Sequence, residues 1–250
     1  MDLREHHSTE QRHPWEVARL RFLLQVLQTR GLLPDVHSVL DAGSGDAWFA
    51  TQLLKSMDDS ATIDCWDAEY TPESMAELRA SLPPQIHLTH KRPTRQHDLI
   101  LLLDVLEHVE DDRGFLATLV QESLKPGGWL LFTVPAWQPL FSRHDTWLHH
   151  HRRYAPAQAE RVLRESGLRV AQSGGLFHSL LLARTLTVVA ERLGPPRKPY
   201  QPTIAWPHNQ AVTRATQAAL DVDNAVSHAA ARAGVQLPGL SFWALCQRPA

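Results

Sequence analysis

The stretch Val39-Leu-Asp-Ala-Gly-Ser-Gly-Asp46 decides the fold, together with the apolar-spaced run from Ala47 to Leu54 that follows it. These residues predict a buried strand that ends at Asp41, a glycine-containing turn, and a helix. Gly43 and Gly45 carry no Cβ, so the turn can adopt positive φ and let a ligand approach the backbone. The helix presents unpaired N–H groups and its positive dipole end to the same place. The stretch therefore predicts a ligand site at the carboxyl end of a strand.

Outward from this stretch, strand-like and helix-like segments alternate along the chain. The predicted strands are Ser38–Asp41, Thr62–Trp66, Ile86–Thr89, Asp98–Leu103, Trp129–Val134, Leu168–Gln172 and Ser241–Cys246. The predicted helices are Trp15–Thr29, Ala47–Met57, Pro72–Leu82, Asp112–Leu124, Pro156–Ser166, Leu176–Leu193 and Asn209–Ala233, and Lys125–Gly128 predicts a turn. This alternation implies right-handed βαβ crossovers. We therefore expect an α/β fold with a seven-stranded, mostly parallel sheet and helices on both faces.

The chain length and composition fit one domain. The 250 residues are 43% hydrophobic and 21% charged, a balance that can bury a sizeable core. We expect a single domain over residues 1–250. It divides into a ligand-binding core over 13–135, a loop and lid insert that caps the fifth strand over 136–207, and a C-terminal helix and final strand over 208–250.

Charge and composition exclude several function classes. A formal net charge of −2 supplies no field that would recruit nucleic acid. The polar start, Met1 to His7, predicts no signal peptide, and no stretch has the apolar length of a membrane span. Cys65 and Cys246 lie in strand-like runs and are expected to be buried thiols of a reducing compartment. These features together predict a cytoplasmic protein.

The residues of the glycine turn indicate the chemistry of its ligand. A phosphate-binding loop of the Walker type needs a lysine at its end, and here Trp48 and Phe49 stand there. A dinucleotide fingerprint needs a third glycine at position 48. The carboxylate of Asp41 would repel a phosphate and attract an amine. The turn therefore favours a ligand with an amino-acid moiety, and a tight turn without a ligand is the alternative.

Four motifs in order resemble class I S-adenosylmethionine (SAM) methyltransferases. The first is the glycine turn, and the second is Asp67, which closes the second strand. The third, Asp98-Leu-Ile-Leu-Leu-Leu-Asp-Val-Leu-Glu-His-Val-Glu-Asp-Asp112, resembles the subgroup related to ubiquinone and menaquinone methyltransferases. The fourth is Leu124-Lys-Pro-Gly-Gly-Trp-Leu-Leu-Phe-Thr-Val-Pro135. The resemblance implies a Rossmann-like fold and covers residues 13 to 175 most closely.

This resemblance also implies the cofactor and its site. The cofactor would be SAM, and the product S-adenosylhomocysteine. The residues placed on it are Arg19, Asp41, Ala42, Gly43, Ser44, Gly45, Asp67, Asp104 and Val105. Asp67 would bind the ribose hydroxyls, and Arg19 the methionine carboxylate, unless Arg19 is simply solvated. The chain departs from the pattern over residues 89–97, where relatives place an acid near the adenine and this segment is basic.

A histidine-rich loop, Phe141 to Tyr154, follows the fifth strand on the ligand-binding side of the sheet. Methyl transfer needs alignment and often the removal of a proton, which histidine performs near neutral pH. The catalytic candidates are His144, next to Asp145, together with His150 and His151. Arg152, Arg153 and Tyr154 are candidates for an anionic substrate. Alternatively, Arg153 and Tyr154 brace the loop, with the arginine paired to an acid such as Glu107.

A divalent metal is a further alternative in this region. Asp104, Glu107 and His108 form D-x-x-E-H, which resembles the E-x-x-E-H that some quinone and RNA 2′-O-methyltransferases use to hold an ion. His150 or His151 would complete the set. The same sequence occurs in methyltransferases that need no metal, and the sequence alone predicts none.

The apolar segment from Leu176 to Leu193 is interrupted by charges, which favours a core or lid helix over a membrane span. Contact with a membrane surface is the alternative, and the proline-rich residues 194–207 either cover the substrate or link elements. We expect a monomer or homodimer that methylates a small-molecule or lipid- or carrier-linked acceptor, at oxygen. The alternatives are a peptide or other macromolecule methyltransferase and an inactive SAM-binding scaffold.

Overall fold

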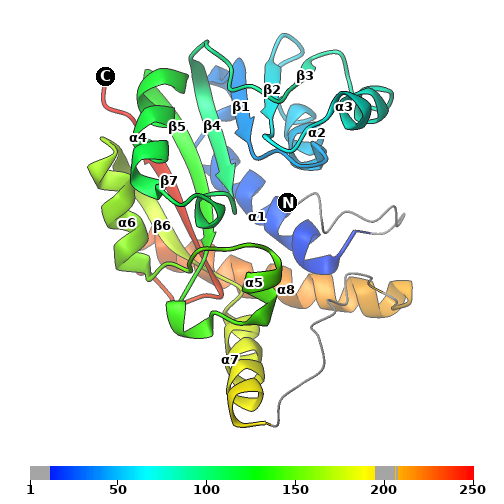
Figure 1. The fold of residues 1–250 in the computed structure, drawn as a ribbon, viewed down its shortest axis with the longest axis vertical. Helices are drawn as coiled ribbons and strands as arrows, with labels where there is room; N and C mark the ends of the chain where they lie inside the picture. Colours follow the sequence, from blue (N-terminus) through cyan, green and yellow to red (C-terminus); the bar gives the residue numbers. More distant parts are fainter. Residues whose placement is uncertain (1–11, 195–205, 207) are drawn as a thin grey trace.

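The computed structural model describes residues 12–194, 206 and 208–250, and its centre is a seven-stranded sheet (Figure 1). The strand order is β3-β2-β1-β4-β5-β7-β6. The strands are β1 (Ser38–Ala42), β2 (Thr62–Trp66), β3 (Ile86–Thr89), β4 (His97–Leu103), β5 (Leu124–Pro135), β6 (Arg169–Leu176) and β7 (Ser241–Gln247). Strands β1 to β5 pair in parallel, and β7 is antiparallel to both β5 and β6. The predicted fold class and strand number are confirmed.

Helices cover both faces of the sheet (Figure 1). They are α1 (Pro14–Thr29), α2 (Trp48–Leu54), α3 (Pro72–Arg79), α4 (Asp112–Ser123), α5 (Arg143–Trp147), α6 (Pro156–Glu165), α7 (His178–Leu193) and α8 (Gln210–Arg232). Successive strand residues point to opposite faces. Val39 packs in the cluster that holds the buried faces of α1 and α2, whereas Leu40 packs in the cluster that holds α4 and α6. A parallel sheet buried on both faces explains the continuous apolar runs of its strands.

Two segments differ from the predictions in the type of secondary structure. Residues Lys125–Gly128, predicted to be a turn, belong to β5, because Gly127 and Gly128 exchange backbone hydrogen bonds with Arg248 near the end of the chain. Strand β6 continues to Leu176, so the helix predicted from Leu176 begins at His178 instead. Both cysteines are buried and free, as predicted.

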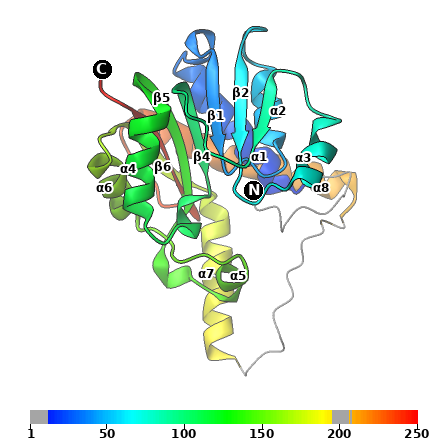
Figure 2. The ribbon, with the colours of Figure 1, turned by 45° about the horizontal axis from the view of Figure 1, so that its top comes forward.

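The segment after β5 extends beyond the carboxyl ends of the parallel strands. It forms the 3₁₀ turn η4 (Gln138–Leu140) and the short helix α5, and both Figures 1 and 2 show α5 beside the long helix α7, which projects away from the sheet. Of the proline-rich segment 194–207, only Gly194 and Trp206 are among the described residues. The prediction that this segment covers the substrate or links elements therefore lies outside the described residues. Over the ranges that the structure describes, no helix is long and apolar enough to cross a membrane.

Candidate functional site

The glycine turn between β1 and α2 has the conformation that its sequence predicts. Gly43 and Gly45 have φ of +73° and +55°, and the Gly43 N–H donates to the Trp66 carbonyl at 2.7 Å. A Cβ on Gly43 would lie 2.4 Å from Cγ2 of Val105, because the turn packs against the residues that follow β4. The absence of a side chain at position 43 therefore lets these two strand ends meet.

Replacing Gly43 by alanine should destabilise the fold more than the same change at Gly127. Both glycines have positive φ, +73° and +77°, so either alanine carries a backbone penalty of about 1–2 kcal/mol. Only the Cβ at position 43 meets another residue, which adds roughly 1–3 kcal/mol of overpacking. Chemical denaturation of the two variants measures the difference in the free energy of unfolding. Equal losses would show that the contact with Val105 is not tight.

Asp41, at the end of β1, is a buried carboxylate with an unmet hydrogen-bonding capacity. It is 3% exposed, and its Oδ2 has no partner among the described residues. Burial, together with the nearby carboxylates of Asp67 and Asp46, raises the pKa of Asp41 to about 7. A buried polar atom without a partner requires an explanation, of which a bound donor is one. Asp41 lines a small cavity of about 30 Å³ that Arg19 and Ser44 also line.

Beside the glycine turn lies a larger cavity of about 380 Å³, called here the turn cavity. Its residues are Ala42, Gly43, Trp66, Asp67, Ala68, Glu69, Asp104, Val105, His108, Val109, Phe115, His149 and His151. Asp67 accepts hydrogen bonds from the amides of Gly45 at 3.0 Å and Glu69 at 2.9 Å, and its carboxylate retains lone pairs for further donors. Val109 and Phe115 supply an apolar wall that the sequence did not predict.

Asp104 and Arg19 form an ion pair where α1 crosses the end of β4. Asp104 also accepts a hydrogen bond from the Thr133 hydroxyl at 2.9 Å. The Arg19 guanidinium lies 4.9 Å from the ring centroid of Trp15, so the cation is held by both an acid and an aromatic face. Arg19 therefore reaches the predicted region, where its partner is Asp104.

A second cavity of about 310 Å³, called here the loop cavity, lies between the histidine-rich loop, α1 and α7. Its residues are Trp15, Arg19, Asp104, Glu107, His108, Pro135, His144, Leu148, His150, Arg153, Phe177, Leu180, Arg184, Leu240 and Ser241. Asp104 and His108 line both the loop cavity and the turn cavity. The two cavities therefore meet at the carboxyl end of β4.

Asp145 is the centre of the histidine-rich loop. It is fully buried, and it accepts hydrogen bonds from His150 Nδ1 at 3.0 Å, Arg153 Nε at 2.7 Å and the Ser142 amide at 2.9 Å. Burial alone would raise the pKa of Asp145, but the bonds from His150 and Arg153 hold it well below its usual range. Because a carboxylate only accepts, Nδ1 of His150 carries a proton, and in the neutral ring the lone pair is therefore on Nε2.

The residues Arg152, Arg153 and Tyr154 are engaged with the chain's own groups. Arg153 binds Asp145, whereas Arg152 and the Tyr154 hydroxyl both bind Asp112, at 2.9 and 2.8 Å. Tyr154 is completely buried. The geometry therefore favours the alternative in which these residues brace the loop, with Asp145 rather than Glu107 as the partner of Arg153.

The three candidate histidines divide between the two cavities. His144 and His150 line the loop cavity, and His151 is exposed at the turn cavity. Burial and the nearby Arg184 lower the pKa of His144 to about 4, so this imidazole is neutral and only weakly basic. His150, fixed by Asp145, is the better-placed proton acceptor of the loop cavity.

Sequence reasoning missed Arg184 as a site residue. This arginine of α7 donates to Ser142 and lies 3.4 Å from Asp145, and its buried Nε has no partner among the described residues. The available signal is one arginine within a mostly apolar stretch of helix, which the sequence alone explains only as a charge that interrupts a membrane span.

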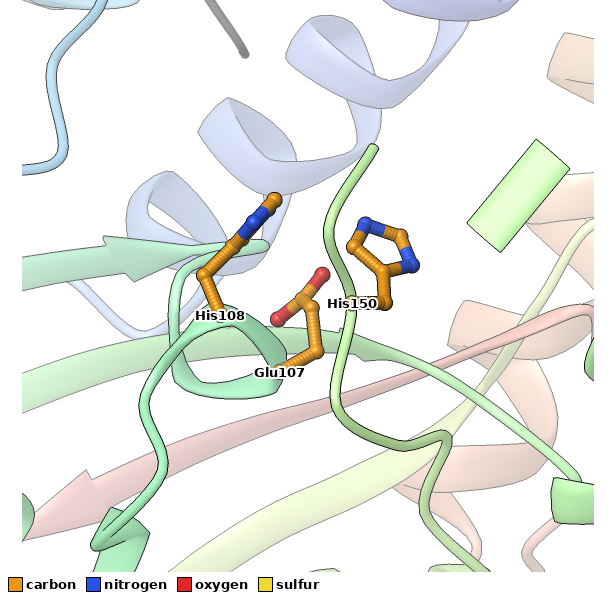
Figure 3. Close-up of side chains that lie close together, drawn as sticks. All are labelled: Glu107, His108 and His150. Carbon is orange, nitrogen blue, oxygen red and sulfur yellow. The ribbon is translucent and has the colours of Figure 1, made fainter. Parts of the chain in front are cut away.

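The residues of the alternative metal set separate in the structure. Glu107, His108 and His150 lie close together (Figure 3), and their ligand atoms are within 4.8 Å of one another. Asp104 instead pairs with Arg19. Burial and the nearby Asp104 raise the pKa of Glu107.

Comparisons with known proteins agree with this fold. The family described as Methyltransferase domain has a profile that matches residues 10–192. A Galdieria sulphuraria protein, named provisionally as a sarcosine dimethylglycine methyltransferase, is 17% identical with a TM-score of 0.57, over 93% of this chain and 86% of that one. A SAM-dependent methyltransferase from Mesorhizobium loti is 16% identical with a TM-score of 0.53, over 92% of this chain and 100% of that one. The methyltransferase domain of bacterial CtHen1-C is 14% identical with a TM-score of 0.54, over 100% of both chains. No protein of curated function matches the chain.

Proposed function

The chain belongs to the methyltransferase-domain family and is a SAM-dependent methyltransferase, and we propose that it methylates an oxygen atom of a small-molecule or lipid-linked acceptor bound in the loop cavity. The observation that carries this proposal is the junction of the two cavities at Asp104 and His108. A cofactor in the turn cavity and an acceptor in the loop cavity would meet there.

The turn cavity and the small cavity at Asp41 together have groups that fit the cofactor. The unpartnered Oδ2 of Asp41 suits the methionine ammonium, and the lone pairs of Asp67 suit the ribose hydroxyls. Val109 and Phe115 offer an apolar surface for the adenine in place of the acid that residues 89–97 lack. When bound, SAM supplies an electrophilic methyl group for in-line displacement by the acceptor.

The loop cavity supplies what an oxygen nucleophile needs. Asp145 orients the His150 ring and keeps its Nε2 lone pair available, so that His150 can accept the proton of an acceptor hydroxyl. Arg184 lines the same cavity, and its Nε has no hydrogen-bond partner among the described residues. This arrangement suits a methyl acceptor that also carries a carbonyl-type oxygen or an anionic group, to which the arginine can donate.

Cofactor affinity should increase with pH between 6 and 7.5. Because the pKa of Asp41 is about 7, its carboxyl is mostly protonated at pH 6 and must lose that proton to bind an ammonium. A pKa near 7 corresponds to a gain of roughly fivefold to tenfold over this range. Isothermal titration calorimetry with SAM at several pH values measures it. An Asp41→Asn variant should bind weakly and without this slope, and a wild-type affinity independent of pH would contradict the assignment.

Replacing His150 by alanine tests the proposed reaction. Loss of a positioned proton acceptor should lower methyl transfer about 100-fold while leaving SAM affinity unchanged. The assay follows label from methyl-labelled SAM into a panel of hydroxylated and carboxylated small molecules. His90→Ala, a change at an exposed histidine beyond β3, is the control and should retain full activity. Full activity in His150→Ala would remove this residue from the reaction.

The exposed face of α7 and the two cavities indicate the class of the methyl acceptor. Four large apolar residues of α7 are exposed, Leu182, Leu186, Val189 and Leu193, and their spacing places them on one helix face, which supports a lipid-linked acceptor and peripheral membrane contact. The limited volume of the loop cavity, about 310 Å³, favours a small acceptor group over a macromolecule. The intact acids Asp41 and Asp67 favour an enzyme over a scaffold. Membership of the ubiquinone and menaquinone subgroup, a cytoplasmic location and a monomeric or dimeric state are part of the same proposal.

A further inference from the structure

Three potential metal ligands converge where the loop cavity meets the end of β4. Glu107 and His108 belong to the 3₁₀ turn η3 (Leu106–His108), and His150 belongs to the histidine-rich loop. Figure 3 shows the Glu107 carboxylate between the two imidazole rings, whose centroids are 4.6 Å apart. One ligand atom from each residue lies within 4.8 Å of the others. Two atoms bound to one first-row metal ion are at most about 4.2 Å apart, so a small inward movement would suffice.

Glu107 is the residue that most requires a partner. It is fully buried, and neither of its carboxylate oxygens has a hydrogen-bond partner within the described residues. The nearby cation Arg153 donates instead to Asp145. A buried carboxyl group without partners is costly, and a bound ion removes that cost.

The surroundings of His150 support metal binding independently. Its Nδ1 donates to Asp145, and the ring nitrogen that remains faces Glu107 and His108 (Figure 3). Asp145 is itself fixed by Arg153 and by the Ser142 amide. A carboxylate that orients the far nitrogen of a histidine is the usual outer support of a metal-binding imidazole, because it fixes the tautomer and the direction of the lone pair.

We propose that Glu107, His108 and His150 bind one divalent transition-metal ion, with its open coordination positions directed into the loop cavity. One carboxylate and two imidazoles form a mixed donor set, which suits manganese, iron or zinc and does not suit calcium. The site lies beside the cavity junction, because His108 lines both cavities.

The chemical consequence of the ion rests on the proposed methylation of an oxygen acceptor. A hydroxyl group coordinated at an open position would have a lowered pKa and would lose its proton to water before the methyl group is transferred. His150 would then act as a ligand rather than as the proton acceptor, and both roles require the same neutral ring with Nδ1 bound to Asp145. Acceptors with two neighbouring oxygen atoms, which can chelate the ion, would be preferred.

Manganese binding to the full-length protein tests this site directly. The protein is treated with a chelator, dialysed and titrated with Mn²⁺, and the electron paramagnetic resonance signal of free Mn²⁺ counts the bound ions. Wild-type protein and the control His90→Ala should bind one equivalent. Glu107→Gln and His150→Ala should lose at least about 100-fold in affinity, and Asp145→Asn about tenfold through the orientation of His150. Circular dichroism checks that each variant is folded.

The outcomes separate this inference from the proposed function. The metal site would be overturned if the wild-type protein bound no Mn²⁺. It would also be overturned if Glu107→Gln and His150→Ala bound one equivalent as tightly as the wild type. SAM titrations of the same samples should give unchanged cofactor affinity in Glu107→Gln, since this residue lies in the loop cavity alone. Methyl transfer that survives full chelation would support the proposed function and show that the reaction does not need the ion. Mn²⁺ binding without methyl transfer to any oxygen acceptor would support the metal site and contradict the proposed function.

Discussion

Replacing Asp41 by alanine should weaken SAM binding roughly 100-fold or more. Its carboxylate is buried, one oxygen has no partner among the described residues, and the small cavity that it lines adjoins the glycine turn. Removing one member of a buried charge pair costs about 2–5 kcal/mol of binding free energy, most of it because the other charge remains desolvated. Isothermal titration calorimetry near pH 7.5, where the wild-type carboxylate is mostly ionised, gives the affinity.

A matched control excludes a general loss of structure. Asp58 is an exposed acid after α2, and its replacement by alanine should leave SAM affinity within about twofold, as expected for a surface change away from the site. Asp41→Ala should remain folded, because it removes a buried polar group that the described residues leave incompletely satisfied. Wild-type affinity in a folded Asp41→Ala protein would remove this residue from the cofactor site.

Replacing Arg153 by alanine should lower the free energy of unfolding by about 3 kcal/mol. Arg153 is 6% exposed and donates to Asp145, which is fully buried. Breaking a buried ion pair from one side leaves the other charge without its compensation, and such changes cost about 3–5 kcal/mol. The remaining bonds from His150 and Ser142 to Asp145 place the expected loss at the lower end. Urea denaturation followed by fluorescence measures this loss.

The neighbouring arginine provides the comparison. Arg152 also forms an ion pair, with Asp112 at 2.9 Å, but its side chain is 23% exposed and Asp112 keeps its bond to Tyr154. We expect Arg152→Ala to cost about 1 kcal/mol or less. If Arg152→Ala were as destabilising as Arg153→Ala, the loop would not depend on the Asp145 pair.

Most of the sheet could be predicted because its strands are short apolar runs between clear turn signals. The predicted bounds of β2 and β3 agree with the structure to the residue. The first part of β5 was misread because Pro126, Gly127 and Gly128 are turn residues by composition, and the backbone partner of the two glycines is Arg248, more than a hundred residues away. The end of β6 was misread for a similar reason. Its glycines allow close approach to Gly239, where a Cβ on Gly175 would lie 2.2 Å from the backbone nitrogen.

The sequence predicts the position of a site residue where that residue stands in a motif at the end of a strand. It does not predict contacts between residues that lie far apart in the chain. Asp41 lies near the end of β1 and Asp67 directly follows the neighbouring strand β2, so their carboxylates line neighbouring cavities. The partner of Asp145 is His150 rather than the adjacent His144, because the turn after α5 brings the later histidine back over the helix. The approach of Arg184 from α7 depends on how that helix packs on the loop, which spacing along the chain does not determine.

The most direct test of the account is a crystal structure of the protein with S-adenosylhomocysteine. We expect the ribose beside Asp67, the amino group at Asp41, and the sulfur at the junction near Asp104, directed toward the loop cavity. In that geometry a methyl group on the sulfur would face His150 and Glu107. Binding of the adenosine in the loop cavity, or a sulfur directed away from it, would contradict the division into cofactor and acceptor cavities.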